Sequence, residues 1–529
     1  MSIEHEQAAA WLAAEPDADM REELSALLKG PTAELVPRFT GRLQFGTAGL
    51  RGAIGSGPQR MNRLVVQQAA AGLVDYLLAK VPNAATQGVI IGYDARRKSD
   101  VFALDTARVC AARGMKAMLF SHIVPTPVLA WNVTEVGAAA GVMVTASHNP
   151  PADNGYKVYL GTGSQIVSPV DSDIAGFIDK VDSCSVPLSA ADDPLITTLG
   201  EDRVTDYLRF VPTTRLSPVV AGVQVAYTAM HGVGGATLLA AFERAGLPAP
   251  AVVAAQQQPD GTFPTVPFPN PEEPGAMDLL LARAAEVGAH VALANDPDAD
   301  RLGAAIPTAD GGWRRLGGDE IGWLLADHIL RHTAGDDRLV ITTLVSSSLL
   351  ARMAAAHGVA CEETFTGFKW IAHTVLANPA KRFIFGYEQA LGYLVCGQPL
   401  DKDGITAAVM LADVAGLAAA EGVTLQDRLD AIAATYGRHI MADRSVHMAP
   451  IDGAAAVARL RAQPPTEVGG SAVTSTQWFA DAGLLRLELG ENMRVQVRPS
   501  GTEPKVKLYG EGIGVDPRPY LEALSALLV

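Results

Sequence analysis

The sequence predicts an α/β protein with three related α/β domains, built on parallel or mixed sheets, and a separate small α+β domain at the C-terminus. Three observations carry this prediction. One βα pattern recurs three times, the last part of the chain alternates apolar and polar residues, and the chain is 529 residues long. A chain of this length ordinarily folds into three or four domains.

The recurring unit is an apolar, β-rich run that leads through a polar or glycine turn into a stretch with helical periodicity. Its three copies are 88–115 (closing at Gly114), 222–247 (closing at Gly246) and 338–359 (closing at Gly358). A glycine directly after a helix is typical of a C-cap. Strands alternating with helices favour parallel or mixed sheets.

The C-terminal part of the chain has a different pattern. Residues 484–512 alternate apolar and polar side chains, which indicates strands, and a short helical pattern follows them. The Pro/Gly-rich span 256–276 is interpreted as a loop near a site or a domain edge. The apolar span 404–423 carries Asp413 in its middle and is interpreted as a buried helix of a soluble protein.

Composition excludes several classes of partner. The net charge of −15 argues against nucleic acid and against a membrane surface, both of which require a basic face. The four cysteines, at 110, 184, 361 and 396, have no spacing that suits zinc or a disulfide framework, and the acidic N-terminus is not a signal peptide. We therefore expect a cytoplasmic protein without nucleic-acid or membrane partners.

Three carboxylates follow the apolar run 291–295 at alternate positions, Asp296, Asp298 and Asp300. At the end of a strand they converge and repel one another, and a divalent cation relieves this repulsion. The spacing is not that of an EF-hand, which requires glycine at position 6 and glutamate at position 12. Oxygen ligands of this type favour Mg²⁺, whereas the alternative is a solvated acidic turn.

Two further segments carry cations on compliant backbone. The segment RPSGTEPK contributes Arg498, Ser500, Gly501, Thr502 and Lys505. This set can bind a phosphate group, and it can equally form a turn between strands with solvated charges. The glycine-rich FGTAGLRGAIG (45–55) can bring Arg51 to a ligand, although glycine-rich loops often only turn the chain.

The segment GYEQALGY (386–393) places Glu388 after the apolar run RFIFGY. A carboxylate there can accept hydrogen bonds from sugar hydroxyls, or it can lie at a helix N-terminus. The segment TFTGFKWI (364–371) offers Lys369 beside aromatic side chains. Neither segment decides between a binding role and a structural one.

The segment VTASHNPPADNGYKVY (144–159) holds the candidate reactive groups Ser147, His148 and Lys157. In an extended segment adjacent side chains point to opposite faces, so we expect His148 not to serve as a base directed at Ser147. If Ser147 carries a phosphoryl group, the acidic triplet and Mg²⁺ can bind it and Lys157 can transfer a proton. The sequence contains no P-loop, no G-x-S-x-G elbow and no G-x-G-x-x-G motif.

The motifs TASHNP…NGYK, NDPDADR, GYEQALGY and RPSGTEPK occur in this order, and together they resemble the α-D-phosphohexomutases, the phosphoglucomutase/phosphomannomutase family. The resemblance covers roughly Phe45 to Tyr509. It implies four domains around a central cleft, the last similar to the TATA-binding-protein fold. We expect them at 1–210 (phosphoserine loop), 211–325 (metal loop), 326–440 (sugar loop) and 441–529 (phosphate loop).

The resemblance also implies roles for individual residues. Ser147 would be the phosphoserine, and its phosphate would share one Mg²⁺ with Asp296, Asp298 and Asp300. The catalytic cations would be Arg51, Lys157 and Arg301, with Lys157 as general acid/base and His148 in the same centre. The sugar would be bound by Lys369, Gly386, Glu388 and Gln389, and its non-reacting phosphate by Arg498, Ser500, Gly501, Thr502 and Lys505.

The implied reaction exchanges phosphate between O1 and O6 of a hexose phosphate (glucose or mannose) through a sugar 1,6-bisphosphate, in a monomer or homodimer. Many family members read G-E-x-S-G-H in the sugar loop, whereas this chain lacks that Ser and His and resembles the phosphoglucomutase-2-like branch. A phosphopentomutase is therefore the alternative. A Mg²⁺-dependent phosphatase and a non-catalytic sugar-phosphate binder are the less favoured ones.

Overall fold

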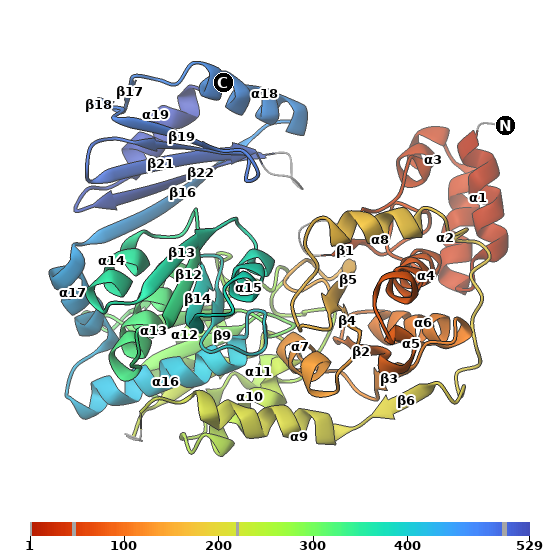
Figure 1. Cartoon of the computed structure of the whole chain (residues 1–529), viewed down its shortest axis with the longest axis horizontal. Helices are drawn as coiled ribbons and strands as arrows, with labels where there is room; N and C mark the ends of the chain where they lie inside the picture. The colour runs from red at the N-terminus through yellow and green to blue at the C-terminus, as the bar shows by residue number, and fades with distance from the viewer. Residues whose placement is uncertain (1–2, 45–48, 218–221, 500–504, 529) are drawn as a thin grey trace.

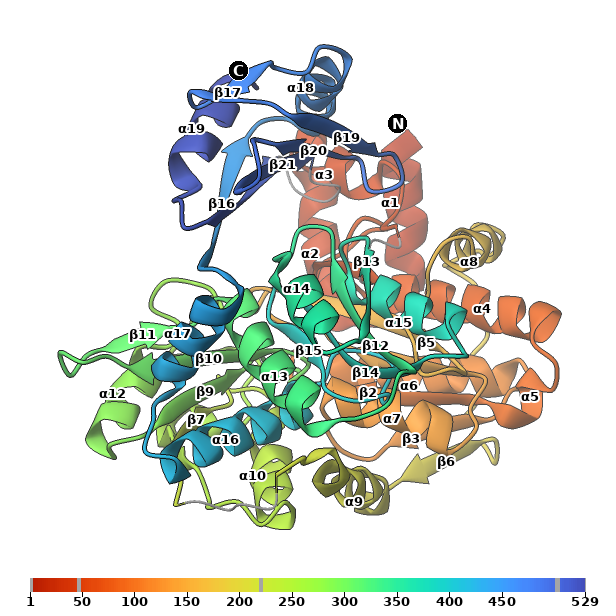
Figure 2. The same cartoon turned by 60° about the vertical axis from the view of Figure 1, so that its left-hand side comes forward.

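The computed structural model describes residues 3–44, 49–217, 222–499 and 505–528. They form three α/β domains and a sheet-rich C-terminal domain, which lies over the third α/β domain (Figures 1 and 2). The predicted fold class is confirmed, whereas the predicted boundaries between the domains stay predictions.

Three helices precede the first domain, and they are α1 (Ile3–Ala14), α2 (Ala18–Lys29) and α3 (Thr32–Phe39). The domain itself contains β1 (Leu50–Ala53), α4 (Arg63–Lys80), α5 (Ala84–Gln87), β2 (Val89–Tyr93), α6 (Ser99–Ala112), β3 (Ala117–Phe120), α7 (Thr126–Glu135), β4 (Ala140–Val144), β5 (Asp153–Leu160), α8 (Val170–Ile178) and β6 (Ile196–Leu199). Its sheet has the order β1-β5-β4-β2-β3-β6. The strands β4, β2, β3 and β6 are parallel, and β5 and β1 continue the sheet in antiparallel pairs.

The second domain follows α9 (Glu201–Phe210) and a short 3₁₀ turn (Val211–Thr214). It contains β7 (Val225–Thr228), α10 (Gly234–Arg244), β8 (Ala251–Val252), α11 (Ala254–Gln257), α12 (Asp278–Glu286), β9 (Val291–Asn295), β10 (Leu302–Pro307) and β11 (Trp313–Arg315). Its sheet has the order β11-β10-β9-β7-β8, in which β9, β7 and β8 are parallel and β10 and β11 antiparallel.

The third domain contains α13 (Gly318–His332), β12 (Arg338–Thr343), α14 (Leu349–Ala356), β13 (Ala360–Thr364), α15 (Phe368–Ala377), β14 (Arg382–Glu388), β15 (Gly392–Leu394), α16 (Gly404–Ala420) and α17 (Leu425–Tyr436). Its sheet has the order β13-β12-β14-β15, with β15 antiparallel to β14. All three sheets are therefore mixed, and in each a parallel strand (β4, β9 or β14) turns directly into an antiparallel one.

The C-terminal domain contains β16 (His439–His447), α18 (Pro450–Ala462), β17 (Glu467–Val468), β18 (Ser471–Ala472), β19 (Ser475–Phe479), β20 (Leu484–Glu488), β21 (Met493–Pro499), β22 (Lys505–Ile513) and α19 (Arg518–Ala526). Its main sheet, β16-β22-β21-β20-β19, is antiparallel throughout. This arrangement confirms the strands and the final helix predicted from residues 484 onward.

The three predicted βα units correspond to β2 with α6, β7 with α10, and β12 with α14. The glycine after each helix has a positive φ, which is +74° at Gly114, +69° at Gly246 and +64° at Gly358. Glycine adopts this conformation without a steric penalty, so each of the three helices ends where the sequence indicates.

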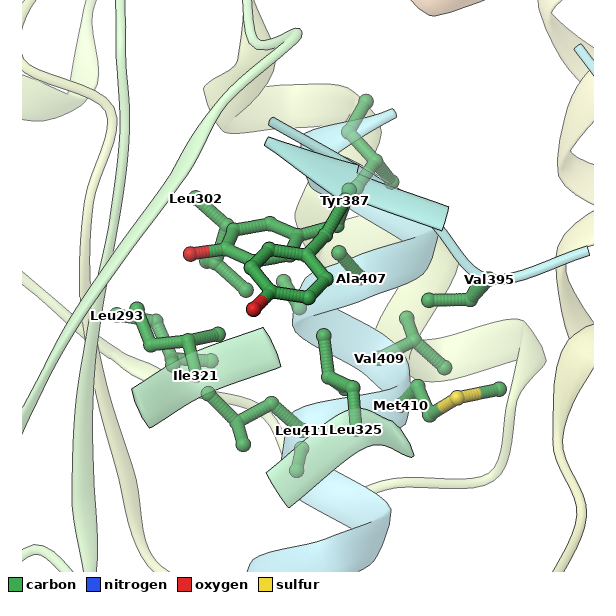
Figure 3. Packing of buried hydrophobic residues seen from close by; sticks show 14 of the residues in the cluster. Leu293, Leu302, Ile321, Leu325, Tyr387, Val395, Ala407, Val409, Met410 and Leu411 are labelled. Atoms are coloured by element: carbon green, nitrogen blue, oxygen red, sulfur yellow. The ribbon is translucent and has the colours of Figure 1, made fainter. Parts of the chain in front are cut away.

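The hydrophobic core is continuous across the three α/β domains. In β2, Ile90 packs into this shared core, whereas Val89 and Ile91 pack into a separate core on the opposite face of the sheet. Helix α16 crosses the shared core, where Ala407, Val409 and Met410 lie among residues of neighbouring strands and helices (Figure 3). The C-terminal domain has a core of its own.

Most residues of α16 are buried, which confirms the predicted buried helix. Its Asp413 carboxylate binds the Arg215 guanidinium at 2.6 Å, so this buried charge is compensated. In the described part of the chain no single helix is long and apolar enough to cross a membrane. Helices α16 and α17 meet that test only as a pair, which is bent by 91°.

Candidate active site

The candidate site is built from loops at equivalent places in the three α/β domains. Each loop follows a parallel strand and leads into an antiparallel one. They are 145–152 between β4 and β5, 296–301 between β9 and β10, and 389–391 between β14 and β15. The strand ends therefore present the serine, the acidic triplet and the sugar-loop residues in corresponding positions.

The three aspartates of the second domain converge as predicted. Asp296, Asp298 and Asp300 are fully buried, and each offers an oxygen within 4.8 Å of the others. Ala299 has φ +58°, a left-handed conformation in the turn between the last two. The Oδ1 atoms of Asp298 and Asp300 are buried and have no hydrogen-bond partner among the described residues. Buried, unpartnered carboxylate oxygens suit a divalent cation with hard oxygen ligands.

Ser147 lies against this triplet. Its Oγ donates a hydrogen bond to Asp296 Oδ2 at 2.8 Å, although the two residues are 149 positions apart. Only 2% of Ser147 is exposed. Its backbone has φ +52°, an uncommon conformation for a residue with a side chain.

The expectation that His148 points away from Ser147 is wrong. Its Nδ1 lies 3.2 Å from Ser147 Oγ. The left-handed backbone of Ser147 makes the segment a turn rather than an extended strand, so the alternation of side chains does not apply. Burial, followed by the nearby charges of Arg301 and Arg51, holds the pKa of His148 well below its usual range. The imidazole is therefore neutral near pH 7 and can take either hydrogen-bond role.

Lys157 comes from β5 and is buried beside the acidic triplet, in contact with two of its three aspartates. Its Nζ donates to Asp298 Oδ2 and to Asp300 Oδ2, both at 2.7 Å. Burial alone raises the pKa of Asp298, but the charge and hydrogen bond of Lys157 outweigh it and place this pKa below its usual value. Asp296 lacks such a partner, and burial followed by the two neighbouring carboxylates raises its pKa.

The two predicted arginines also reach the site. Arg51 lies on β1 opposite Gly155 of β5, and its Nη1 donates to Asn149 Oδ1 at 3.1 Å in the serine loop. Arg301 ends the acidic loop, where its backbone N–H donates to Asp296 Oδ1 at 3.0 Å and its Nη1 to the carbonyl of Ala390 in the sugar loop. The side-chain Nε atoms of both arginines are buried without a partner among the described residues.

Two residues of the site, Lys402 and Thr126, are not predicted from the sequence. Lys402 Nζ lies 2.8 Å from Asp300 Oδ2, and Thr126 Oγ1 donates to Asp298 Oδ2 at 2.6 Å. Lys402 stands between two aspartates in the segment DKDG, a pattern that usually indicates solvated charges. Thr126 begins α7 and stands 172 positions from its partner, so no local signal identifies it.

The residues predicted to bind the sugar differ in their surroundings. Glu388 ends β14, and its Oε1 accepts a hydrogen bond from the backbone N–H of Gly367, directly before α15. Lys369 lies in the first turn of that helix, where burial lowers its pKa. Gln389 is held by Ser346, whose Oγ donates to its Oε1 at 3.0 Å. Gly386 is buried within β14, paired on both sides, and a Cβ there would lie 3.0 Å from Ile371.

Gly386 therefore packs within the sheet, and its assignment to sugar binding stays a prediction. In the predicted phosphate loop, Arg498 lies on β21 with its Nε donating to the Tyr509 hydroxyl at 3.3 Å, and Lys505 begins β22. Ser500, Gly501 and Thr502 lie outside the described residues.

Family models describe most of the chain. Residues 42–184, 206–311 and 317–436 match "Phosphoglucomutase/phosphomannomutase, alpha/beta/alpha domain" I, II and III, respectively. The chain belongs to the phosphoglucomutase/phosphomannomutase family. The resemblance noted in the motifs is thereby confirmed, and so is the class of enzyme, a phosphosugar mutase.

Individual relatives of this family member carry different names. A "Probable phosphomannomutase" of Haemophilus influenzae is 42% identical, and the alignment covers 87% of this chain and 94% of that protein. The human "Phosphopentomutase" is 33% identical over 96% of this chain and 91% of its own length. The human "Glucose 1,6-bisphosphate synthase" is 36% identical over 81% and 73%, respectively.

Solved structures share the fold at low identity. A phosphoglucomutase/phosphomannomutase family protein from Burkholderia thailandensis superposes with a TM-score of 0.71 at 18% identity, covering 91% of this chain and 97% of that one. The Paramecium phosphoglucomutase parafusin, in an open form, gives 0.69 at 16% identity, covering 93% and 94%. These likenesses concern the fold alone.

Proposed function

We propose that this mutase exchanges phosphate between O1 and O6 of a hexose phosphate through a phosphorylated Ser147 and a sugar 1,6-bisphosphate. The observation that carries the proposal is the buried contact between Ser147 Oγ and Asp296 Oδ2 at 2.8 Å. The Ser147 hydroxyl thereby lies beside three buried carboxylates that suit a divalent cation. Phosphoryl transfer requires little more than positioning, cations and a proton acceptor.

The transfer itself conserves phosphate. A free sugar hydroxyl attacks the phosphorus of phosphoserine, the bond between phosphorus and Ser147 Oγ breaks, and a sugar bisphosphate forms. The other phosphate then returns to Ser147 by the reverse reaction. In the balance of the step the proton of the attacking hydroxyl ends on the leaving Ser147 Oγ. Lys157 is assigned to this proton transfer as general acid/base, and Lys402 contacts the same Asp300 carboxylate at 2.8 Å. One ammonium group can thus hold the negative charge while the other transfers a proton.

A divalent cation, which we assign as Mg²⁺, would be held by Asp296, Asp298, Asp300 and the phosphate on Ser147. When bound, it neutralises charge on the phosphoryl group during transfer. The unpartnered Oδ1 atoms of Asp298 and Asp300 support this assignment. Arg51 and Arg301 are assigned to the same phosphoryl oxygens because both come from elements that border the serine loop or the acidic loop.

The remaining parts of the substrate are assigned to the other two domains. Glu388 uses one carboxylate oxygen on Gly367, and its other oxygen has no partner in the described part of the chain, so it can accept a sugar hydroxyl. Lys369, at the start of α15, and Gln389, the residue after Glu388, are assigned to the same sugar. Arg498 on β21 and Lys505 at the start of β22 are assigned to the non-reacting phosphate, together with Ser500, Gly501 and Thr502, which lie outside the described residues.

The second candidate is a phosphopentomutase, because a relative of that name aligns with 96% of this chain. The relative of 42% identity, named as a phosphomannomutase, favours hexose. The pocket contacts that separate such sugars are worth about 1–3 kcal/mol, so a ranking of substrates is more informative than a single activity. We expect a cytoplasmic protein, which its four free cysteines support, and its assembly as a monomer or homodimer stays a prediction.

The deciding experiment compares kcat/KM for glucose 1-phosphate, mannose 1-phosphate and ribose 1-phosphate with Mg²⁺ and the matching bisphosphate. The proposal predicts the highest value for a hexose. A higher value for ribose 1-phosphate would establish the second candidate. Release of inorganic phosphate at the rate of substrate loss would instead identify a phosphatase and reject both.

A further inference from the structure

Arg96 lies directly beneath the loop that carries Ser147. It follows β2 in the turn that leads into α6, and 3% of it is exposed. Its Nη2 donates to the carbonyls of Ser147 and Asn149 at 2.6 and 2.5 Å, and its Nη1 to those of Pro150 and Asp153 at 2.8 and 3.1 Å. One guanidinium therefore binds four carbonyls of the loop.

The geometry of these contacts explains how Ser147 holds its uncommon backbone. Its φ of +52° turns its carbonyl toward Arg96, while its Oγ faces Asp296. A planar guanidinium with two outward nitrogens can bind carbonyls on both, whereas an ammonium group donates from a single point. Asp94 holds the base of Arg96 by accepting its backbone N–H at 2.9 Å.

A residue of the second domain, Phe263, also contacts the Arg96 guanidinium. The guanidinium carbon lies 4.9 Å from the ring centre of Phe263, which is 2% exposed. In the same segment, a Cβ on Gly261 would lie 2.4 Å from the carbonyl oxygen of Ala95, so the two backbones are in direct contact. A cation over a buried aromatic ring is worth about 2 kcal/mol.

We propose that Arg96, braced by Phe263, is a positioning residue that sets the backbone of Ser147 so that its Oγ faces the acidic triplet. Because Phe263 and Asp296 both belong to the second domain, docking of that domain aligns the phosphate carrier and its metal ligands together. The proposal rests on the phosphoserine role given to Ser147 above. It assigns a function to the segment that follows β2, which no step of the reaction uses.

The test measures kcat and KM for the preferred sugar 1-phosphate in three variants. Arg96→Lys should lower kcat about 100-fold, as expected when a reacting group is displaced by about 1 Å. Its KM should change less than about threefold, since no substrate contact is lost. Phe263→Leu should lower kcat about tenfold. In the double variant the second change should add little, because both act on one guanidinium.

Arg63→Lys is the matched control. Arg63 is also a shielded guanidinium of the first domain, but it binds the Asp105 carboxylate at 2.7 and 2.8 Å, away from Ser147. Its kcat should stay within about twofold of the wild type. A second readout is the single-turnover rate of Ser147 phosphorylation by glucose 1,6-bisphosphate, which should fall in parallel with kcat in the Arg96 and Phe263 variants only.

A folded Arg96→Lys protein with wild-type kcat, or an equal loss of kcat in Arg63→Lys, would overturn the proposal. If thermal unfolding shows that Arg96→Lys does not fold, the Phe263→Leu variant alone tests the positioning role of Arg96. A wild-type kcat in Phe263→Leu would then overturn the proposal. The Ser147→Ala variant distinguishes failure of the phosphoserine role of Ser147 from failure of the positioning role of Arg96. Full activity in that variant rejects the phosphoserine itself, whereas its inactivity combined with an active Arg96→Lys protein rejects only the positioning role.

Discussion

Ser147 Oγ donates to Asp296 Oδ2 at 2.8 Å, which joins the serine loop of the first domain to the acidic loop of the second. Both residues are buried, so the contact is made in a medium where charges interact strongly. The acidic loop bears three carboxylates, and Lys157 and Lys402 compensate two of them in part. Predictions about the metal and about these lysines follow directly from this balance of charge.

Asp298→Asn is expected to weaken the binding of Mg²⁺. The substitution removes one anionic ligand, so the Mg²⁺ concentration at half-maximal activity should rise at least about tenfold, the lower end of effects seen when metal-site partners are lost. The measurement is a Mg²⁺ titration of kcat. Asp310→Asn, in the exposed turn between β10 and β11, is the control and should leave the titration unchanged. An unchanged titration in Asp298→Asn would reject the metal site.

Lys402→Met is expected to make the stability of the protein depend more strongly on Mg²⁺ than it does in the wild type. The change leaves the Asp300 carboxylate with one lysine instead of two, which should cost about 3 kcal/mol in the absence of metal. Mg²⁺ should recover much of this loss because it supplies the missing positive charge. Thermal unfolding with MgCl₂ and with EDTA measures the difference. Lys180→Met, on the surface, should respond to Mg²⁺ only as much as the wild type does. An equal response to Mg²⁺ in Lys402→Met and Lys180→Met would contradict the role of Lys402.

Glu388→Gln is expected to affect sugar recognition. Glutamine can still accept the backbone N–H of Gly367, but it offers a sugar hydroxyl a weaker acceptor. Loss of a charge-assisted hydrogen bond costs about 1.5–3 kcal/mol, so kcat/KM for the sugar 1-phosphate should fall roughly 10- to 100-fold. Steady-state kinetics test this, with Glu362→Gln on β13 as the control. A wild-type kcat/KM in Glu388→Gln would remove Glu388 from the substrate site.

The contact between the third and C-terminal domains should depend on pH through Glu511. Its Oε1 accepts from Ser347 Oγ at 2.6 Å, and its Oε2 lies 2.7 Å from Arg494. Burial alone raises the pKa of Glu511, but His439, Arg494 and Ser347 outweigh it and lower the pKa to about 2. The stabilisation is therefore present above the ordinary pKa of glutamate, near 4.5, and is lost as the pH falls from there toward 2.

Glu511→Gln tests this linkage. At pH 7 the variant should be less stable than the wild type by roughly 3 kcal/mol, from a lowering of about 2.5 pKa units at about 1.36 kcal/mol each. The difference should shrink as the pH falls from 5 to 3, because Glu511 of the unfolded wild-type chain becomes protonated there while the folded carboxylate stays ionised. Urea midpoints at several pH values measure it. A difference that is constant with pH would show that the ionised carboxylate is not the stabilising group.

The fold and the site differ in how far the sequence predicts them. The βα units and their closing glycines are local patterns, and Gly114, Gly246 and Gly358 end their helices as predicted. The Asp triplet is predictable because its members stand at alternate positions within five residues of the chain. Lys402, Thr126 and Arg96 are not, since each reaches its partner only after the sheets have folded.

His148 shows why local reasoning fails at a strained residue. Side chains alternate between two faces only where the backbone is extended. Nothing in the sequence around Ser147 indicates its φ of +52°. The conformation is imposed by contacts from elsewhere, including the hydrogen bond from Arg96 to the Ser147 carbonyl. Backbone of this kind is held by its surroundings and occurs often at functional sites.

The proposed reaction depends on a phosphate carried by Ser147. Mass spectrometry of the purified protein after incubation with glucose 1,6-bisphosphate and Mg²⁺ tests it most directly. We expect one phosphate per chain, located on the peptide that contains Ser147, with none in Ser147→Ala. A fully active protein with unmodified Ser147, before and after incubation, would contradict the account.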